Sequence, residues 1–203
     1  MNPIFPFATA ITLLVFLSPL PTLNAVVLDT DGEDVRNSGG SYYIIPKGSS
    51  NGLTLTQRPG SPSCPLYITQ ITTSPGTSVT ISALVRTLFI PVSARVNIVF
   101  NTDVATCADP LEWHVTPDLA TGKSYVTAGG GSTVSSYRFS IEQAGNGEKD
   151  NIYKIRYCPS AEEDETNCGD VGFLGENGLL GINNENPLFV QFKKVNTGMS
   201  EIV

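Results

Sequence analysis

The sequence predicts an all-β domain, a closed barrel or a sandwich built from many short strands. The first observation is a series of short runs rich in Val, Ile, Thr, Tyr and Phe, the residue types that favour strands. The second is a set of turn sequences containing Gly, Asn or Pro between these runs. The third is that no long window keeps the apolar spacing of a helix. Hydrophobic residues make up 40% and charged residues 15% of the 203 positions, which is an ordinary globular composition.

The predicted strands follow one another with turns between most of them. Ile152–Tyr157 and Phe189–Lys193 alternate apolar and polar side chains, the period expected of a half-buried strand. Turns are expected at Asn51-Gly52, Ser74–Gly76, Gly129–Gly131, Asn146-Gly147 and Asn177-Gly178. Strands are expected at Tyr42–Ile45, Leu66–Ile71, Val79–Ile81, Leu88–Ile90, Val96–Phe100, Trp113–Val115, Ser124–Thr127, Ser136–Ile141, Ile152–Tyr157 and Leu188–Phe192. We see no linker that would divide them into two domains.

The N-terminus indicates the secretory pathway. Residues 1–25 carry no charged side chain and contain an apolar run, Ile11–Leu17. This run is shorter than the roughly 20 residues that span a membrane, and it matches the apolar centre of a secretory signal. We expect cleavage after Ala25 and a single domain over residues 26–203, secreted or delivered to a vacuole. The alternative is that the run is a buried strand of the core. We expect no association with a membrane.

Four cysteines stand at positions 64, 107, 158 and 168, and none forms a Cys-x-x-Cys pair. An even number in a chain on an oxidising route indicates two disulfides rather than a zinc site or thioredoxin chemistry. Three pairings are possible. Joining Cys158 to Cys168 across a short polar loop is the simplest, and it leaves Cys64 to pair with Cys107.

Charge and motifs exclude several functions. The net charge of −7, with no compensating Lys/Arg stripe, argues against a nucleic-acid partner. The single histidine, His114 in a strand-like run, argues against His-based catalysis and most zinc sites. Gly122–Ser124 lacks the first glycine of a phosphate loop, and Asp29–Gly32 lacks the spacing of a calcium loop. The acidic cluster Glu162–Glu165 is expected to be solvated rather than a catalytic carboxylate pair. We therefore expect neither enzyme activity nor a metal or cofactor.

Arg86 is the residue that suggests an activity. It stands alone among apolar and small residues, between two strand-like runs. An exposed, extended segment of this kind would present a basic side chain to a trypsin-like pocket whose floor carries a carboxylate. The alternative is an edge-strand arginine that keeps its head in solvent.

Several segments, in order along residues 26–203, resemble the plant Kunitz inhibitors of the soybean trypsin inhibitor type. They are Val27–Val35, Gly39–Ile44, Cys64–Leu66, Val96–Phe100, Trp113, Tyr153–Pro159, Cys168–Gly172 and Pro187–Phe192. The resemblance implies a β-trefoil of twelve short strands with pseudo-threefold symmetry. It also implies the disulfides Cys64–Cys107 and Cys158–Cys168.

The same resemblance places a reactive loop. Counting back from Phe100 puts the primary specificity residue at Arg86, with Thr87 after the scissile bond. Counting forward from Gly76 reaches Leu84 instead, which would favour a chymotrypsin-like target. Leu84, Val85 and Leu88 would then flank the reactive bond. The family braces its loop with an Asn of the N-terminal turn, which matches Asn37, although Ser38 makes this stretch one residue longer than the usual pattern.

The implied function is inhibition of a trypsin-like serine protease by a monomer that needs no cofactor. Arg86 would fill the specificity pocket, and a rigid loop would keep the cleaved bond in place. Two alternatives keep the same fold. One is a non-inhibitory storage or defence protein, or a module that binds carbohydrate or a receptor. The other is an inhibitor of chymotrypsin, subtilisin, a cysteine protease or an amylase.

Overall fold

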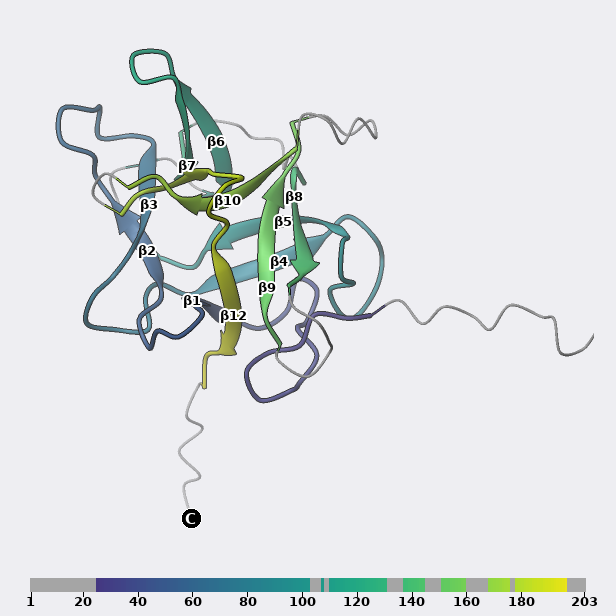
Figure 1. Ribbon diagram of the computed structural model, residues 1–203. Helices are drawn as coiled ribbons and strands as arrows, with labels where there is room; N and C mark the ends of the chain where they lie inside the picture. Colours follow the sequence, from purple (N-terminus) through teal and green to yellow (C-terminus); the bar gives the residue numbers. More distant parts are fainter. Residues whose placement is uncertain are drawn as a thin grey trace, which may run out of the picture.

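The computed structural model describes residues 25–102, 107, 110–130, 137–144, 151–159, 168–175 and 178–196. Twelve strands lie in this part of the chain, with no helix among the described residues (Figure 1). The strands are β1 (Tyr42–Pro46), β2 (Leu53–Thr56), β3 (Leu66–Gln70), β4 (Val79–Ala83), β5 (Arg95–Phe100), β6 (Trp113–Asp118), β7 (Lys123–Ala128), β8 (Phe139–Gln143), β9 (Tyr153–Tyr157), β10 (Gly169–Phe173), β11 (Leu180–Ile182) and β12 (Phe189–Lys194). A search of the described residues finds no helix long and apolar enough to cross a membrane.

Six of the strands form a closed ring of antiparallel pairs. Around the ring β1 pairs with β4, β4 with β5, β5 with β8, β8 with β9, β9 with β12, and β12 with β1. The other six strands form the hairpins β2–β3, β6–β7 and β10–β11, which pair with one another through β7. Figure 1 shows these hairpins gathered above the ring. Each consecutive group of four strands gives its outer two to the ring and its middle two to a hairpin, which is the β-trefoil.

One large core fills the ring and continues up to the hairpins. Trp113 of β6 is fully buried and packs between Phe100 of β5 and Phe139 of β8, with ring centroids 5.9 and 5.8 Å apart. The alternating burial of Val79–Ala83 shows how the period of two in the sequence directs apolar side chains into this core. A second, smaller cluster of Tyr67, Tyr125 and Leu179 lies among the hairpins.

Most expected strands are confirmed, with ends that differ by a few residues. The expectation for Leu88–Ile90 is wrong, because this segment makes isolated bridges and single hydrogen bonds rather than a ladder. Strands β2, β10 and β11 were not expected from the residues individually. Glycines at 169, 172 and 181 weaken the strand signal of β10 and β11. Ser136 and residues 1–24, with the expected signal segment, lie outside the described residues.

Both expected disulfides are confirmed. Cys64 is bonded to Cys107 and Cys158 to Cys168, and no free cysteine remains. The longer bridge fastens the start of β3 to the β5–β6 connection, so it joins the first four-strand unit to the second. The shorter one joins the end of β9 to the start of β10, two strands that already pair at Tyr157 and Gly169.

Candidate functional site

The connection between β4 and β5 projects from the ring, on the right of Figure 1, and carries a run of exposed side chains. All five residues from Leu84 to Leu88 are exposed, and the apolar side chains of Leu84 and Leu88 are 67% and 80% accessible. Exposing large apolar groups in this way has a cost in water, so a run of them marks a surface for binding. Arg86 lies in the middle of the run, and its side chain has no hydrogen-bond or ion-pair partner among the described residues.

The side-chain amide of Asn37 holds this loop from beneath. Its Nδ2 donates to the carbonyl oxygens of Val85 and Thr87, each at 3.0 Å. Its Oδ1 accepts the backbone N–H of Ala83 at 2.8 Å. The two bonded carbonyls belong to the residues on either side of Arg86, and Thr87 N–H donates to Val85 O at 3.0 Å. Arg86 is therefore the apex of a short turn tied to one side chain.

The outgoing half of the loop pairs with the N-terminal segment. Asn37 N–H donates to Leu88 O at 2.9 Å, and Arg36 forms an antiparallel bridge with Phe89. Ser38, the additional residue of this stretch, adopts a φ of 57°, and its N–H donates to Ile81 O at 2.9 Å. The left-handed conformation turns the chain at Ser38, so Asn37 still reaches the loop.

Leu84 occupies a different setting from Arg86. Its N–H donates to Arg95 O at 3.1 Å, which continues the ladder between β4 and β5 by one residue. The Asn37 contacts are centred two residues later. The sequence analysis identified the loop and Asn37, but it did not identify the pairing of Arg36 with Phe89. Nothing in the sequence marks these two residues except that they stand near Asn37 and the loop.

The other residues that the sequence brought to attention lie apart from the loop, and their surroundings are structural. His114 is a partly buried residue of β6, opposite Thr127 of β7. Gly122 ends the turn between β6 and β7, where its N–H donates to Asp118 O. The buried Asp29 closes its own turn by accepting the N–H groups of Asp31 and Glu33, each at 2.9 Å. The acidic cluster at 162–165 lies outside the described residues.

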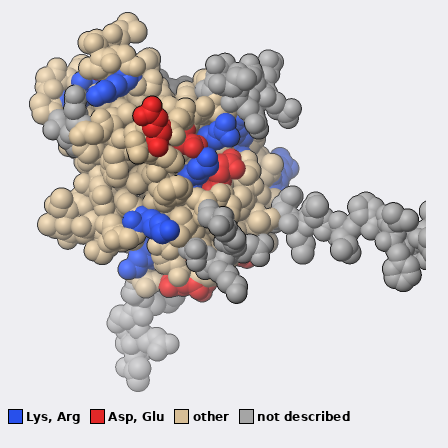
Figure 2. Space-filling view, viewed as in Figure 1, with Lys and Arg blue, Asp and Glu red and all other residues tan. Residues whose placement is uncertain are grey.

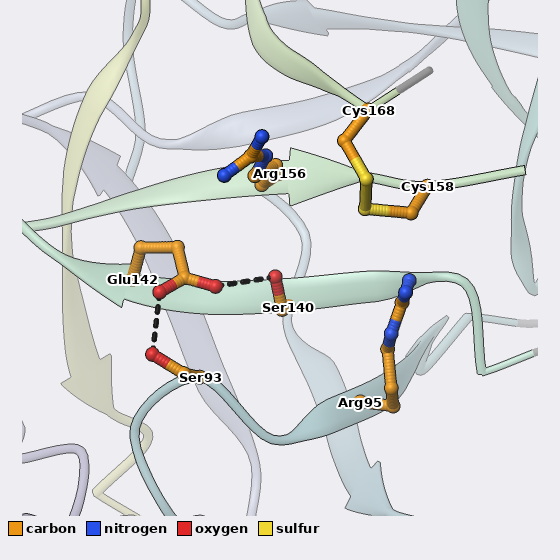
Figure 3. Close-up of a pocket in the computed structure, with 7 residues that line it drawn as sticks. All are labelled: Ser93, Arg95, Ser140, Glu142, Arg156, Cys158 and Cys168. Atoms are coloured by element: carbon orange, nitrogen blue, oxygen red, sulfur yellow. Dashed lines mark hydrogen bonds between the residues drawn. A yellow bond between two sulfur atoms is a disulfide. The ribbon is translucent and has the colours of Figure 1, made fainter. Parts of the chain in front are cut away.

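A polar pocket of about 230 Å³ lies on another part of the surface (Figure 3). Figure 3 shows Arg95, Arg156 and Glu142 around it, with the Cys158–Cys168 disulfide at one side. The hydroxyls of Ser93 and Ser140 donate to Glu142. No imidazole is among its described lining residues. No three His, Cys, Asp or Glu side chains in the described part of the chain are grouped to hold a metal.

Charges are mixed on the face that Figure 2 shows. Lys and Arg are interspersed with Asp and Glu there, and most of the described surface is uncharged. The exposed loop is a presented peptide segment, braced by one amide on a disulfide-bonded trefoil, an arrangement suited to a binding protein.

The chain belongs to the legume Kunitz family of trypsin and protease inhibitors, whose family model matches residues 27–194. It is 42% identical over 178 residues to trypsin inhibitor BvTI of Bauhinia variegata, covering 84% of this chain and 96% of that protein. The structure resembles soybean trypsin inhibitor, with a TM-score of 0.69 and 29% identity over 85% of this chain and all of that one. It also resembles the soybean inhibitor in complex with porcine pancreatic trypsin, with a TM-score of 0.68, 27% identity and the same coverage.

Proposed function

We propose that this protein inhibits a trypsin-like serine protease by inserting the Arg86–Thr87 bond into the catalytic centre. The observation that carries the proposal is the pair of Asn37 hydrogen bonds to the carbonyls on either side of Arg86. Membership of the inhibitor family and the likeness to a protease-bound relative support it. The Kunitz fold provides no catalytic group for this role, since the chemistry is that of the protease.

Arg86 would supply the affinity for trypsin-like enzymes. Its exposed side chain is available to enter a pocket that ends in a carboxylate, where charge-assisted hydrogen bonds form away from water. Because the loop is already tied at three points, it would lose little conformational entropy on binding. Leu84, Val85 and Leu88 would lie in the neighbouring subsites.

The same contacts would make hydrolysis slow and reversible. Cleavage of the Arg86–Thr87 bond creates a new amine at Thr87. Asn37 binds the carbonyls of Val85 and Thr87, and its own N–H binds Leu88 O, so both new chain ends would remain tethered. A leaving amine held next to the acyl group competes with water for it. The loop would therefore be resealed more often than it is released.

The choice of Arg86 rather than Leu84 rests on where the loop is tied. The Asn37 contacts surround Arg86, while Leu84 still bonds to β5. Arg86 lies beyond the last bond of that ladder, so it is the better placed of the two to enter a protease. We further propose that the protein acts as a monomer and follows the secretory pathway to a vacuole or the cell exterior, as the apolar N-terminal run and the two disulfides suggest.

The test is an inhibition titration of trypsin with three variants of Arg86. Arg86→Ala leaves the carboxylate of the pocket without its partner, which costs about 2–5 kcal/mol, or roughly 30-fold to several thousandfold in affinity. Arg86→Lys should keep most inhibition because it keeps a cation. Arg86→Leu should shift the preference toward chymotrypsin.

Leu84→Ala is the matched control, because Leu84 is as exposed as the rest of the loop but is expected to lie two subsites away. It should change trypsin binding far less than Arg86→Ala. If Leu84→Ala abolishes chymotrypsin inhibition while Arg86→Ala leaves trypsin binding unchanged, Leu84 is the specificity residue. If the native protein inhibits neither enzyme, the proposed function is wrong, and assays with subtilisin, a cysteine protease and an amylase follow.

A further inference from the structure

Beside the reactive loop lies a hollow of about 290 Å³, lined by Arg36, Asn37, Gly39, Leu88 and Phe89. Its apolar lining comes from Leu88, which is 80% exposed, and from Phe89. Its cationic edge is Arg36, which also lines a second, polar hollow on its other side. Arg36 thus stands between two depressions on the surface that continues from the scissile bond toward Leu88.

Arg36 is held close to the reactive bond by backbone pairing. Its bridge with Phe89 places it opposite a residue three positions past Arg86. Three extended residues span at most about 10 Å, and paired backbones lie about 5 Å apart. An arginine side chain covers much of that distance. When a protease binds Thr87 and Leu88 in its leaving-group subsites, the surface beside those subsites would therefore lie against Arg36.

The guanidinium of Arg36 forms no ion pair with a described residue. The hydrogen bond and charge of Lys194 lower the pKa of the Glu33 carboxyl, and the charge of Arg36 adds to this effect. Glu33, the nearby carboxylate, pairs with Lys194 at 2.7 Å instead. Arg36 has no hydrogen bond or ion pair from its side chain to any described residue, and it is exposed. Its stem lies along Gly39, where an added Cβ would be 3.6 and 3.8 Å from Cβ and Cδ of Arg36. The stem is thus partly positioned while the charge faces outward.

We infer that Arg36 is a second specificity residue, which selects proteases that carry a carboxylate beside their leaving-group subsites. The inference rests on the proposed function, since it names the partner's chemistry at the same interface. The hollow would take an apolar side chain from that wall of the protease, and Arg36 would face its carboxylate. Arg36 and Arg86 are exposed cations, and the carboxylates Glu33 and Asp34 line the hollow on the other side of Arg36. A cation that meets a carboxylate of the partner favours correctly oriented encounters.

The test measures association rates and dissociation constants of Arg36→Ala and Arg36→Glu with trypsin at low and high salt. A pair at an exposed rim contributes little, so Arg36→Ala should weaken binding about two- to fivefold and Arg36→Glu about tenfold. Most of the loss should appear in the association rate at low salt and shrink at high salt, because salt screens exposed charges. Lys47→Ala and Lys47→Glu are the matched controls. Lys47 is an exposed cation that follows the C-terminal end of β1, whereas Arg36 precedes the N-terminal end of that strand.

A trypsin whose carboxylates around the leaving-group subsites are changed to amides completes a double-mutant cycle. We expect the difference between native protein and Arg36→Glu to disappear with this enzyme. If the Arg36 and Lys47 variants behave alike while Arg86→Ala still abolishes inhibition, the inference on Arg36 is wrong and the proposed function stands. If Arg36→Ala instead speeds cleavage of the loop and Arg36→Lys does not restore the association rate, Arg36 supports the loop and does not select the protease.

Discussion

At the scale of single residues, Asn37 connects two parts of the chain that are almost fifty positions apart in sequence. Its amide satisfies one N–H and two C=O groups of the loop at once. An amide is suited to this, because it carries donors and an acceptor on one rigid plane. Aspartate would lack the donors for the carbonyls of Val85 and Thr87. We therefore expect Asn37 to support the loop more than the fold.

Asn37→Ala should weaken trypsin inhibition and speed cleavage of the loop. A side-chain hydrogen bond contributes about 0.5–1.5 kcal/mol. Losing most of the contribution of the three Asn37 bonds should therefore weaken the affinity for trypsin roughly ten- to hundredfold. The melting temperature should change little, because the loop lies outside the core. Inhibition titrations and electrophoresis of the cleaved chain over time provide the measurement. Asn51→Ala is the control, since Asn51 also donates to a loop carbonyl, that of Thr72, in another part of the molecule.

Unchanged inhibition and unchanged loop cleavage in Asn37→Ala would contradict this role. The loop would then be held by its backbone pairing with residues 35–37 alone. Ser38→Gly tests whether the turn at position 38 needs the serine side chain. Ser38 has a φ of 57°, which glycine adopts more readily, so this variant should keep both the turn and the inhibition.

At the scale of elements, a clamp holds the turn end of the β6–β7 hairpin, where Asp118 pairs with Lys123. Arg58 pairs with Asp118 at 2.7 Å, and its guanidinium lies 4.7 Å from the ring centroid of Tyr125. The hydrogen bond from Arg58, followed by that from Ala120 N–H, lowers the pKa of the Asp118 carboxyl to about 2. The clamp joins the connection after β2 to a hairpin of the second four-strand unit, so it stabilises contact between two units.

The stabilisation from Asp118 should depend on pH in a defined direction. A carboxyl whose pKa is lowered by folding stabilises the fold above its unfolded pKa, about 3.9, and loses that contribution as pH falls through about 2. Asp118→Asn should therefore lower the melting temperature at pH 7, and the difference from the native protein should vanish near pH 2. Thermal unfolding followed by circular dichroism measures both. Glu185→Gln, at an exposed carboxylate, should show no such difference at either pH; a loss equal to that of Asp118→Asn would assign the effect to net charge.

The elements also show where sequence reasoning reaches its limit. Strands such as Tyr153–Tyr157 were predicted from the alternation of their apolar and polar side chains. That pattern is local, so it can be read without knowing which strands they pair with. Strands β10 and β11 were missed because their glycines are explained only by close packing. A Cβ on Gly172 would lie 2.3 Å from Asn186 O, and one on Gly181 would lie 2.3 Å from Ser124 O. These approaches involve residues distant in sequence, so no local pattern records them.

Part of the candidate site could likewise be predicted from the sequence and part could not. The exposed loop with its single arginine was visible in the sequence, and the resemblance pointed to Asn37. The hydrogen bonds from Asn37 to Val85 O and Thr87 O, on which the proposal of Arg86 rests, follow the turn at Ser38, whose φ could not be inferred from composition. Leu88–Ile90 was predicted as a strand because its residues are apolar, yet Leu88 is exposed. An exposed apolar loop of this kind cannot be told from a strand in sequence, because both are runs of apolar residues.

At the scale of the whole molecule, the trefoil is held together by contacts between its three units. The ring closes only when β12 returns to β1, which pairs residues near 42 with residues near 194. Such long-range pairing has a high loop-closure cost before it brings any gain. Cross-links between units reduce that cost in the unfolded chain. The two disulfides differ in this respect, with sequence separations of 43 and 10 residues.

Removing Cys64–Cys107 should destabilise the fold more than removing Cys158–Cys168. Loop-closure entropy gives about 4 kcal/mol for the first bridge and about 3 for the second, and β9 and β10 are in any case paired beside the second. We expect the Cys64→Ser, Cys107→Ser variant to lose about 2–5 kcal/mol in the free energy of unfolding, measured by urea denaturation with fixed slopes. Neither bridge joins residues of the β4–β5 connection, so we expect trypsin inhibition by the folded fraction to stay unchanged at 25 °C. Unfolding at the native urea midpoint would show that the longer bridge is dispensable, and a loss of inhibition without a loss of stability would mean that it positions the loop.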